Sequence, residues 1–181
     1  MVCWGVFLAS GVRRYARAAL AILAALGLAA GIAVSAGLLA GKPPPDLGLR
    51  SAGGQTLLKA PSPSPNSVSS QADLPLYASH PQRDYARIAP LRYKGDGPAA
   101  LQRLAQVLEK MERTKLTQRS PSYLRAESST AWMGFTDDLE FWLDEPASVI
   151  HLRSGSRLGR KDFGANRERV ERIRALFSQA V

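Results

Sequence analysis

The side chains best suited to acid–base chemistry lie close together in the second half of the sequence. Glu127, Asp138 and Glu140 are carboxylates on or beside two predicted strands, and His151 lies on the next one. Because alternate residues of a strand point to the same face, Asp138 and Glu140 share a face. A carboxylate or His151 in a polar pocket could move a proton. These four are the candidate catalytic residues; the alternative is a cross-strand network of ion pairs without chemistry.

A second group of candidates, suited to binding an anion, follows His151. It comprises Arg153, Ser154, Ser156, Arg157 and Asn166. The arginines could hold two oxygens at once, the serines could donate hydroxyl hydrogen bonds, and the final helix would begin with its positive end at Asn166. We expect a phosphate, a carboxylate or a lipid headgroup as the ligand. The alternative is structural: both arginines pair with Asp137, Asp138 or Glu140, and Asn166 only caps the helix.

Other catalytic and metal-binding patterns are missing from the sequence. One cysteine, Cys3, and two distant histidines, His80 and His151, are too few for a thiolate zinc cluster or a histidine-rich site. The sequence has no nucleophile elbow, no phosphate-binding loop and no His-Glu-x-x-His pattern. We therefore expect no metal, no cofactor and a binding module without enzymatic activity. A small hydrolase that uses the four acid–base candidates is the alternative.

Hydrophobic periodicity predicts the elements that must position these residues. Apolar residues recur at helical spacing over 98–112, and a last helix with an apolar stripe follows Asn166. Between these helices, short alternating segments predict strands over 115–119, 123–132, 138–143 and 149–153. We predict an α+β fold: a small antiparallel sheet of about four strands, with two helices packed on one face, preceded by a transmembrane helix.

The transmembrane helix is predicted over residues 18–41, where 24 consecutive positions carry no charge. A helix of that length is about 36 Å long and spans a hydrocarbon core of about 30 Å. The basic segment 1–17 precedes it with Arg13, Arg14 and Arg17. This charge bias predicts a single-pass inner-membrane protein with its N-terminus in the cytoplasm and its C-terminal domain in the periplasm. The alternative is a signal peptide cleaved near Ala36, which would release the domain into the periplasm.

Composition divides the rest of the chain into two parts. Residues 42–79 are rich in proline, serine and glycine and predict an extended linker, whereas residues 80–181 carry the pattern of the globular domain. The net charge is +9, with eighteen arginines and six lysines. An arginine-rich surface suits an anionic lipid or an envelope protein as partner. We expect no nucleic acid partner, because the domain is predicted to lie outside the cytoplasm.

Several segments resemble a known family. They are Asn66–Gln71, Tyr123–Glu127, Phe135–Phe141, Arg153–Gly159 and Asp162–Arg174. Over roughly residues 61–178 the chain resembles the family catalogued as domain of unknown function 1499, found in bacteria and photosynthetic eukaryotes. The family often has cysteine where this chain has Ser67. The resemblance implies that residues 66–71 pack on the domain, and it implies no activity.

Overall fold

The structure is a computed structural model of the chain, and it describes residues 4–35, 37, 39–131 and 133–180. It comprises two compact units, Met1–Leu39 and Ala40–Val181. Three positions named above lie outside the described residues: Cys3, the possible cleavage position Ala36, and Trp132 at the end of a predicted strand.

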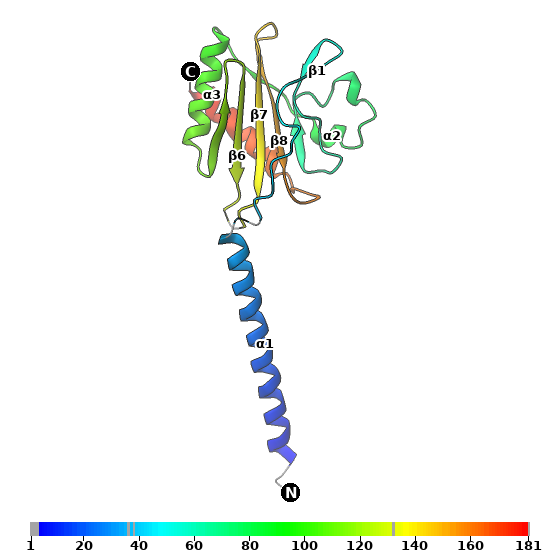
Figure 1. The fold of residues 1–181 in the computed structure, drawn as a ribbon, viewed down its shortest axis with the longest axis vertical. Coiled ribbons are helices and arrows are strands. Elements are labelled where there is room, and N and C mark those ends of the chain that lie inside the picture. Colours follow the sequence, from blue (N-terminus) through cyan, green and yellow to red (C-terminus); the bar gives the residue numbers. More distant parts are fainter. Residues whose placement is uncertain (1–3, 36, 38, 132, 181) are drawn as a thin grey trace. The chain divides into compact units, whose positions relative to one another are not determined.

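The first unit is a single helix, α1 (Trp4–Ser35), which begins earlier and ends earlier than the predicted span. Its stretch Tyr15–Ile32 is long and apolar enough to cross a membrane, and Figure 1 shows α1 as one continuous helix. A signal sequence near an N-terminus has the same character. The helix is therefore compatible with both the anchor and the cleaved segment.

The second unit contains an antiparallel sheet of six strands in the order β3-β8-β7-β6-β5, with β4 also paired to β8. The strands are β3 (Ser67–Ser69), β4 (Leu91–Arg92), β5 (Thr114–Arg119), β6 (Tyr123–Ser129), β7 (Thr136–Asp144) and β8 (Val149–Ser156). The α+β class and the antiparallel pairing are confirmed. The sheet is larger than the predicted four strands because two very short strands, β3 and β4, pair with β8.

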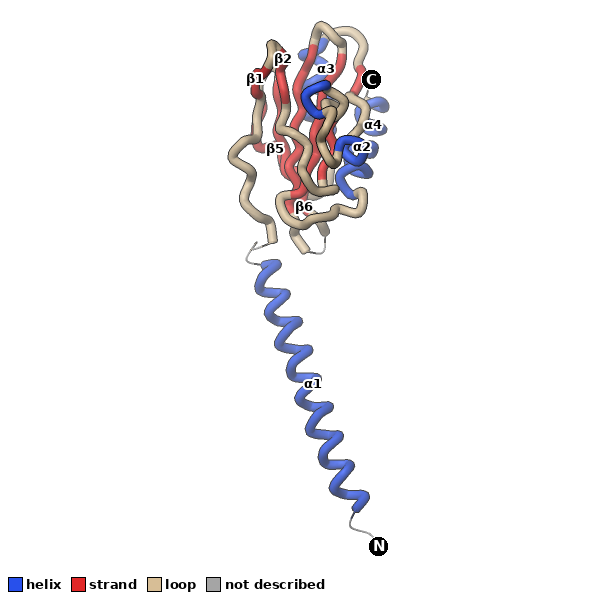
Figure 2. Tube along the Cα trace, turned by 90° about the vertical axis from the view of Figure 1, so that its right-hand side faces the viewer, coloured by secondary structure: helices blue, strands red, loops and turns tan. Residues whose placement is uncertain are grey.

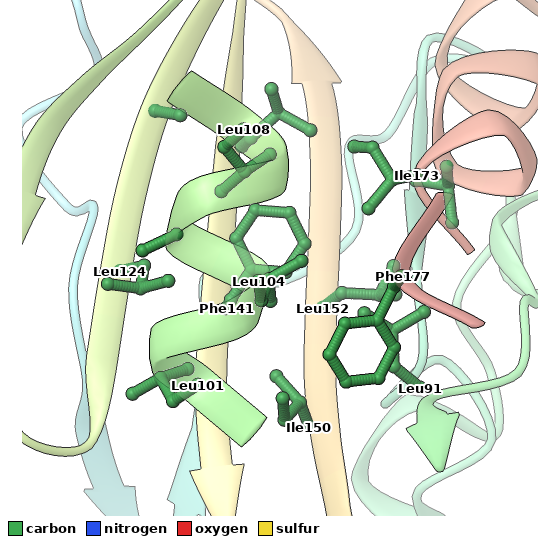
Figure 3. Close-up of a cluster of buried hydrophobic side chains, with 14 of the residues drawn as sticks. Leu91, Leu101, Leu104, Leu108, Leu124, Phe141, Ile150, Leu152, Ile173 and Phe177 are labelled. Carbon is green, nitrogen blue, oxygen red and sulfur yellow. The ribbon is translucent and has the colours of Figure 1, made fainter. Parts of the chain in front are cut away.

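One face of the sheet is apolar and carries the core with helices α3 (Gly97–Lys110) and α4 (Ala165–Gln179). Figure 3 shows Leu104 of α3 and Ile173 of α4 among the side chains that meet Phe141 and Leu152 of the sheet. Helix content differs from the prediction, since a short helix, α2 (Arg83–Ala86), and a 3₁₀ turn, Pro75–Tyr77, are also present.

The starts of α3 and α4 show how the sequence positions them. Asp96 caps α3 by accepting a hydrogen bond from the Ala99 amide at 2.7 Å. For α4 the expected cap, Asn166, is wrong: the helix begins at Ala165 after Gly164, which has φ of 88°. The Asp162 carboxylate accepts from the Gly164 and Asn166 amides at 3.0 and 3.2 Å instead. The Asn166 side chain is therefore free for another role.

Residues 42–79 are not the extended linker that their composition predicted. Leu58 and Val68 are 1% and 0% exposed, and the segment belongs to the unit that begins at Ala40. A hairpin of β1 (Arg50–Ala52) and β2 (Gln55–Leu57) precedes β3. Figure 2 shows this hairpin on the side of the sheet opposite α3 and α4. The segment can pack because β8 forms hydrogen bonds with its backbone at β3. Its few apolar residues, such as Leu57 and Leu58, are buried.

The sheet face opposite α3 and α4, here called the polar face, carries the acid–base candidates. Alternation along β6, β7 and β8 places Glu127, Asp138, Glu140, His151 and Arg153 on it. Ser154 and Ser156 point to the opposite face, toward α4. This division decides which candidates can act together.

Candidate functional site

Asp138 is held on the polar face by a two-pronged contact with Arg157. The arginine Nε donates to Oδ2 at 2.9 Å and its Nη2 donates to Oδ1 at 2.8 Å. The same Nη2 also donates to Glu127 Oε1 at 2.5 Å. The hydrogen bonds with Asp138 raise the pKa of Arg157 above its usual value, so the guanidinium stays charged. Arg157, predicted to bind an anion, thus pairs with Asp138 and Glu127, which were predicted to be catalytic.

Glu140 and Arg153 form a second pair on the polar face, and both side chains are buried, with 0% and 4% exposed. Glu140 Oε1 accepts hydrogen bonds from the Tyr123 hydroxyl at 2.9 Å and from the Gly48 amide at 2.8 Å. Glu140 Oε2 faces Arg153 Nη1 at 3.7 Å. Burial lowers the pKa of Arg153, while the charge of Glu140 opposes the shift. Gly48 belongs to the segment predicted as a linker, so this segment covers part of the polar face at Glu140.

On the opposite face, Asn166 joins three segments at the end of the sheet. Its side-chain amide donates to the Asn66 carbonyl at 3.0 Å and to Ser156 Oγ at 2.9 Å. Its carbonyl accepts from Ser154 Oγ at 2.5 Å. Arg169 completes the cluster: it donates to the Asn166 carbonyl at 2.9 Å and pairs with Asp137 at 2.6 Å. Ser154 and Asn166 are both 0% exposed.

The five predicted ligand-binding residues therefore do not form one site. Arg153 and Arg157 lie on the polar face, and the other three, Ser154, Ser156 and Asn166, lie on the helix face. Every one of them is engaged with other groups of the chain. The geometry corresponds to the structural alternative, in which the arginines hold the sheet together through Asp138 and Glu140. Asn66 was missed as a partner because it comes from a distant segment. Arg169 was missed because, although it lies in the same helix as Asn166, its charged partner Asp137 comes from β7.

His151 is the one predicted catalytic residue that no arginine holds in the described part of the chain. Its ring stacks on Trp142 with centroids 5.2 Å apart and an interplanar angle of 11°. Nδ1 lies 3.1 Å from Ser70 Oγ, and Nε2 lies 3.6 Å from Asp144 Oδ2. Burial lowers the pKa of His151, and the charge of Asp144 opposes that shift. The imidazole is neutral at pH 7 and can accept a proton.

A pocket of about 320 Å³ adjoins this histidine. It is lined by Gly54, Gln55, Thr56, Gln71, Leu74, Trp142, Asp144 and His151. The hairpin β1–β2 supplies one wall and the polar face supplies the other. Neither Ser70 nor Asp144 was predicted to act with His151. These three residues come from different segments and form no local motif.

A larger pocket, of about 550 Å³, lies at the other side of the sheet near the turn between β7 and β8. It is lined by Arg92, Tyr93, Lys94, Arg103, Ala147, Ser148, Phe177 and Ser178. We call this the basic pocket, because three cations and no carboxylate line it. The Arg103 guanidinium lies 5.9 Å from the centroid of the Phe177 ring, and its Nε is buried without a hydrogen-bond partner.

None of the three cations in the basic pocket forms an ion pair with a carboxylate in the described part of the chain. Acidic residues act instead on the Tyr93 hydroxyl: burial raises the pKa of Tyr93, and the charges of Glu145, Asp144 and Asp96 raise it further. The sequence pattern did not identify this site, because its residues come from the segment Arg92–Lys94, from α3 and from α4.

Two further features bear on the chemistry that these sites can hold. Among the described residues, no group of three or more His, Cys, Asp or Glu side chains is placed to hold a metal ion. Ser67, where the resembled family often has cysteine, is 1% exposed, and its Oγ accepts from the Ser62 amide at 2.8 Å. In this chain the position serves the packing of the segment before β3.

Comparison with known proteins identifies the family and no activity. No curated protein and no solved structure matches the chain. The model of a family described as "Protein of unknown function (DUF1499)" matches residues 58–177, which confirms the resemblance. The match begins inside the segment predicted as a linker, in agreement with its packing on the sheet. Since the match covers well over half of the chain, the protein belongs to the DUF1499 family.

Proposed function

We propose that this protein is a membrane-anchored binding module whose domain, residues 40–181, takes a small anionic ligand in the basic pocket. The observation that carries the proposal is the group Arg92, Lys94 and Arg103, which line one pocket without an ion-pair partner among the described residues. Unpaired cations beside a pocket favour a carboxylate or phosphate, because such a ligand supplies the missing charge and hydrogen-bond acceptors.

The walls of the basic pocket add a requirement for an apolar part of the ligand. Tyr93 and Phe177 contribute aromatic surface, and a volume of about 550 Å³ is typical of pockets for small organic ligands. Arg103 stacks near Phe177 and presents a buried Nε–H without an acceptor. An anion with a compact apolar or aromatic group would use both features. The ligand class is therefore the one expected from the sequence, and the site is different.

The anchor and the orientation of the domain belong to the same proposal. Arg13, Arg14 and Arg17 precede the apolar stretch of α1, and such a bias keeps the basic end in the cytoplasm. A C-terminal alkaline phosphatase fusion tests this in a bacterial host. Active phosphatase on a protein of full mass is the expected result. A soluble product shortened near Ala36 would show cleavage, and an inactive fusion would contradict the periplasmic placement.

Ligand binding is tested with phenyl phosphate, a soluble anion with one aromatic ring, by calorimetry on the full chain in nanodiscs. We expect saturable binding that weakens at least about tenfold in both Arg103→Gln and Lys94→Gln, since a hydrogen bond to a charged group contributes about 1.5–3 kcal/mol. Lys115→Gln is the matched control, since it removes the same charge from an exposed position on β5. Equal affinity in all variants, or no saturable binding, would contradict the proposal.

A second candidate function rests on the alignment of Ser70, His151 and Asp144. A hydroxyl within hydrogen-bond reach of a neutral histidine, with a carboxylate 3.6 Å from the other ring nitrogen, is similar to the arrangement of an activated nucleophile. In ester hydrolysis, Ser70 Oγ would attack the carbonyl carbon and pass its proton through His151 Nδ1 to the leaving alcohol. Water would then release the acyl group. This arrangement replaces the predicted hydrolase set, because Glu127, Asp138 and Glu140 face arginines.

A fluorophosphonate probe with mass spectrometry tests this second candidate. Covalent modification of Ser70, lost in Ser70→Ala and strongly slowed in His151→Gln, would support a nucleophilic serine. The absence of a modified Ser70 in the unaltered chain would dismiss hydrolysis and leave the binding function alone.

A further inference from the structure

The loop Leu158–Phe163, between β8 and α4, exposes apolar and basic side chains together; we call it the docking loop. Phe163 is 94% exposed and Leu158 is 42% exposed. Arg160 and Lys161 between them are exposed and form no ion pair in the described part of the chain. A nearly fully exposed phenylalanine does not gain the free energy that its burial would provide. Its exposure therefore indicates a surface that another partner covers.

The exposure of Phe163 is fixed by the residues next to it. Asp162 turns inward, where its carboxylate accepts hydrogen bonds from Tyr85, from the Gly164 amide and from Asn166. Phe163 itself has φ of 52°, in the left-handed region that a bulky residue rarely adopts. Burial raises the pKa of Asp162, but the hydrogen bonds from Tyr85 and Asn166 outweigh burial and lower it overall. The loop therefore keeps its one carboxylate inside and presents the aromatic ring and two cations outward.

The docking loop is joined to the first residues of the domain. The Arg157 guanidinium donates to the Gly41 carbonyl at 3.3 Å. A Cβ at Gly41 would lie 3.1 Å from Leu158 Cγ, so the two segments are in close contact. Helix α1 ends at Ser35, and residues 36–41 reach at most about 20 Å when fully extended. Chain length alone therefore keeps this loop near the end of the anchor.

We propose that the docking loop inserts into the membrane that holds the anchor. Phe163 and Leu158 enter the boundary between headgroups and acyl chains, where aromatic side chains are favoured. Arg160 and Lys161 pair with lipid phosphates, and anionic lipids strengthen the contact. Met133, 44% exposed, lies in the adjacent loop between β6 and β7 and adds apolar surface. The ligand of this surface is a lipid bilayer.

This inference rests on a retained anchor, and it is independent of the basic pocket. Within the domain, the docking loop follows the end of β8, whereas the pocket adjoins the turn Ala147–Ser148 before its start (Figure 1). The two sites thus lie at opposite ends of the same strand. Membrane insertion at one end leaves the other end open to a soluble ligand.

The test uses spin labels in the full chain, with Cys3→Ser to remove the native thiol. A nitroxide is placed at one of three positions, through Phe163→Cys, Ala147→Cys or Leu26→Cys, in nanodiscs with 30% anionic phosphatidylglycerol. Power saturation with oxygen and a water-soluble nickel chelate reports depth. We expect the label at residue 163 to be shielded from nickel at least fivefold more than the label at 147, and the label at 26 to lie deeper still.

Each other outcome overturns a defined part of the inference. A label at 163 as open to nickel as the label at 147, with residue 26 deep in the bilayer, overturns the docking loop and leaves the anchor intact. A label at 26 in water overturns the anchor itself. Equal depth of residue 163 in anionic and in neutral phosphatidylcholine nanodiscs overturns the role of Arg160 and Lys161.

Discussion

Arg157, the residue after β8, and Asp138, near the start of β7, are joined by two parallel hydrogen bonds, of 2.9 and 2.8 Å. The side chains are 5% and 1% exposed, so water cannot replace either partner. Removing the cation from a buried carboxylate strongly lowers the free energy of unfolding, whereas the intact pair contributes little to it. Arg157 and Asp138 therefore belong to the framework of the domain, and the docking loop begins where this framework ends.

The first prediction concerns this pair. Arg157→Gln removes both close hydrogen bonds of the buried Asp138 and leaves it only the longer contact from Arg125 Nη2, at 3.3 Å. The free energy of unfolding should therefore fall by about 3 kcal/mol, the lower end of the cost of breaking a buried pair. Chemical denaturation measures the loss. Arg119→Gln is the control, since that arginine and Glu109 are each 50% exposed and 3.8 Å apart, and exposed pairs contribute about 0–1 kcal/mol. Similar losses in both variants would show that the buried pair has no special role.

The second prediction concerns Gly155, which leaves room for the Arg153 side chain. A Cβ at this position would lie 2.7 Å from Arg153 Nη2 and 3.0 Å from Cζ. Because Arg153 is 4% exposed, it has little space to move, and Gly155→Ala should cost about 1–3 kcal/mol. A double-mutant cycle with Arg153→Met checks the cause. The cost of the alanine should fall by at least about 1 kcal/mol in that background, and an unchanged cost would place the clash elsewhere.

The third prediction concerns the pH dependence of stability through His151. Its pKa in the fold lies below the ordinary value, about 6.5, that the unfolded chain has. As pH falls through 6.5, the unfolded chain binds the proton first, so the free energy of unfolding decreases. Unfolding at pH 7.5 and 5.5 measures the change. His151→Gln should reduce the slope, and a slope that persists unaltered in this variant would assign the titration to another group.

The fourth prediction concerns the segment before β3. Leu58 is 1% exposed, and its backbone amide donates to Gln71 Oε1 at 2.8 Å. Leu58→Ala should destabilise the domain by about 2–5 kcal/mol. Leu49→Ala, at a position 39% exposed, should cost well under half as much. An unchanged free energy of unfolding in Leu58→Ala would contradict the packing of this segment and support an extended linker.

The elements that the sequence predicted well are those with a strong local pattern. Leu101, Leu104 and Leu108 recur at helical spacing in α3, and Leu139, Phe141 and Leu143 alternate in β7. Both patterns report burial on one face, which a single segment can reveal. The structure places the elements within a few residues of their predicted ranges.

The missed elements depend on partners far away in the sequence. Ser67 and Ser69 of β3 are buried because they pair with Gly155 and Arg153 of β8, and no local pattern encodes that pairing. A segment rich in proline and serine was interpreted as extended because its own apolar residues are few. The sheet edge supplies the hydrogen bonds that such a segment lacks.

The candidate site was predicted in part for the same reason. Strand alternation gave the common face of His151 and Arg153, and the structure has both side chains on it. The sequence offered Asp138 as one of three possible partners of Arg157 but could not choose among them, and it could not reveal that Arg103 has no ion-pair partner among the described residues. These relations join β7, β8 and α3 across the fold. Charge in the sequence suggested an anion ligand, and it gave no indication of the basic pocket that we propose for such a ligand.

The most direct test of the anion-binding function observes the buried Nε–H of Arg103 by nuclear magnetic resonance. The full chain is labelled with ¹⁵N-arginine in nanodiscs, and Arg103→Lys assigns the signal. This N–H has no acceptor in the structure, so a bound phenyl phosphate should give it one and shift its resonance in a saturable manner. A resonance that stays in place, while the ligand is present at millimolar concentration, would contradict anion binding in the basic pocket.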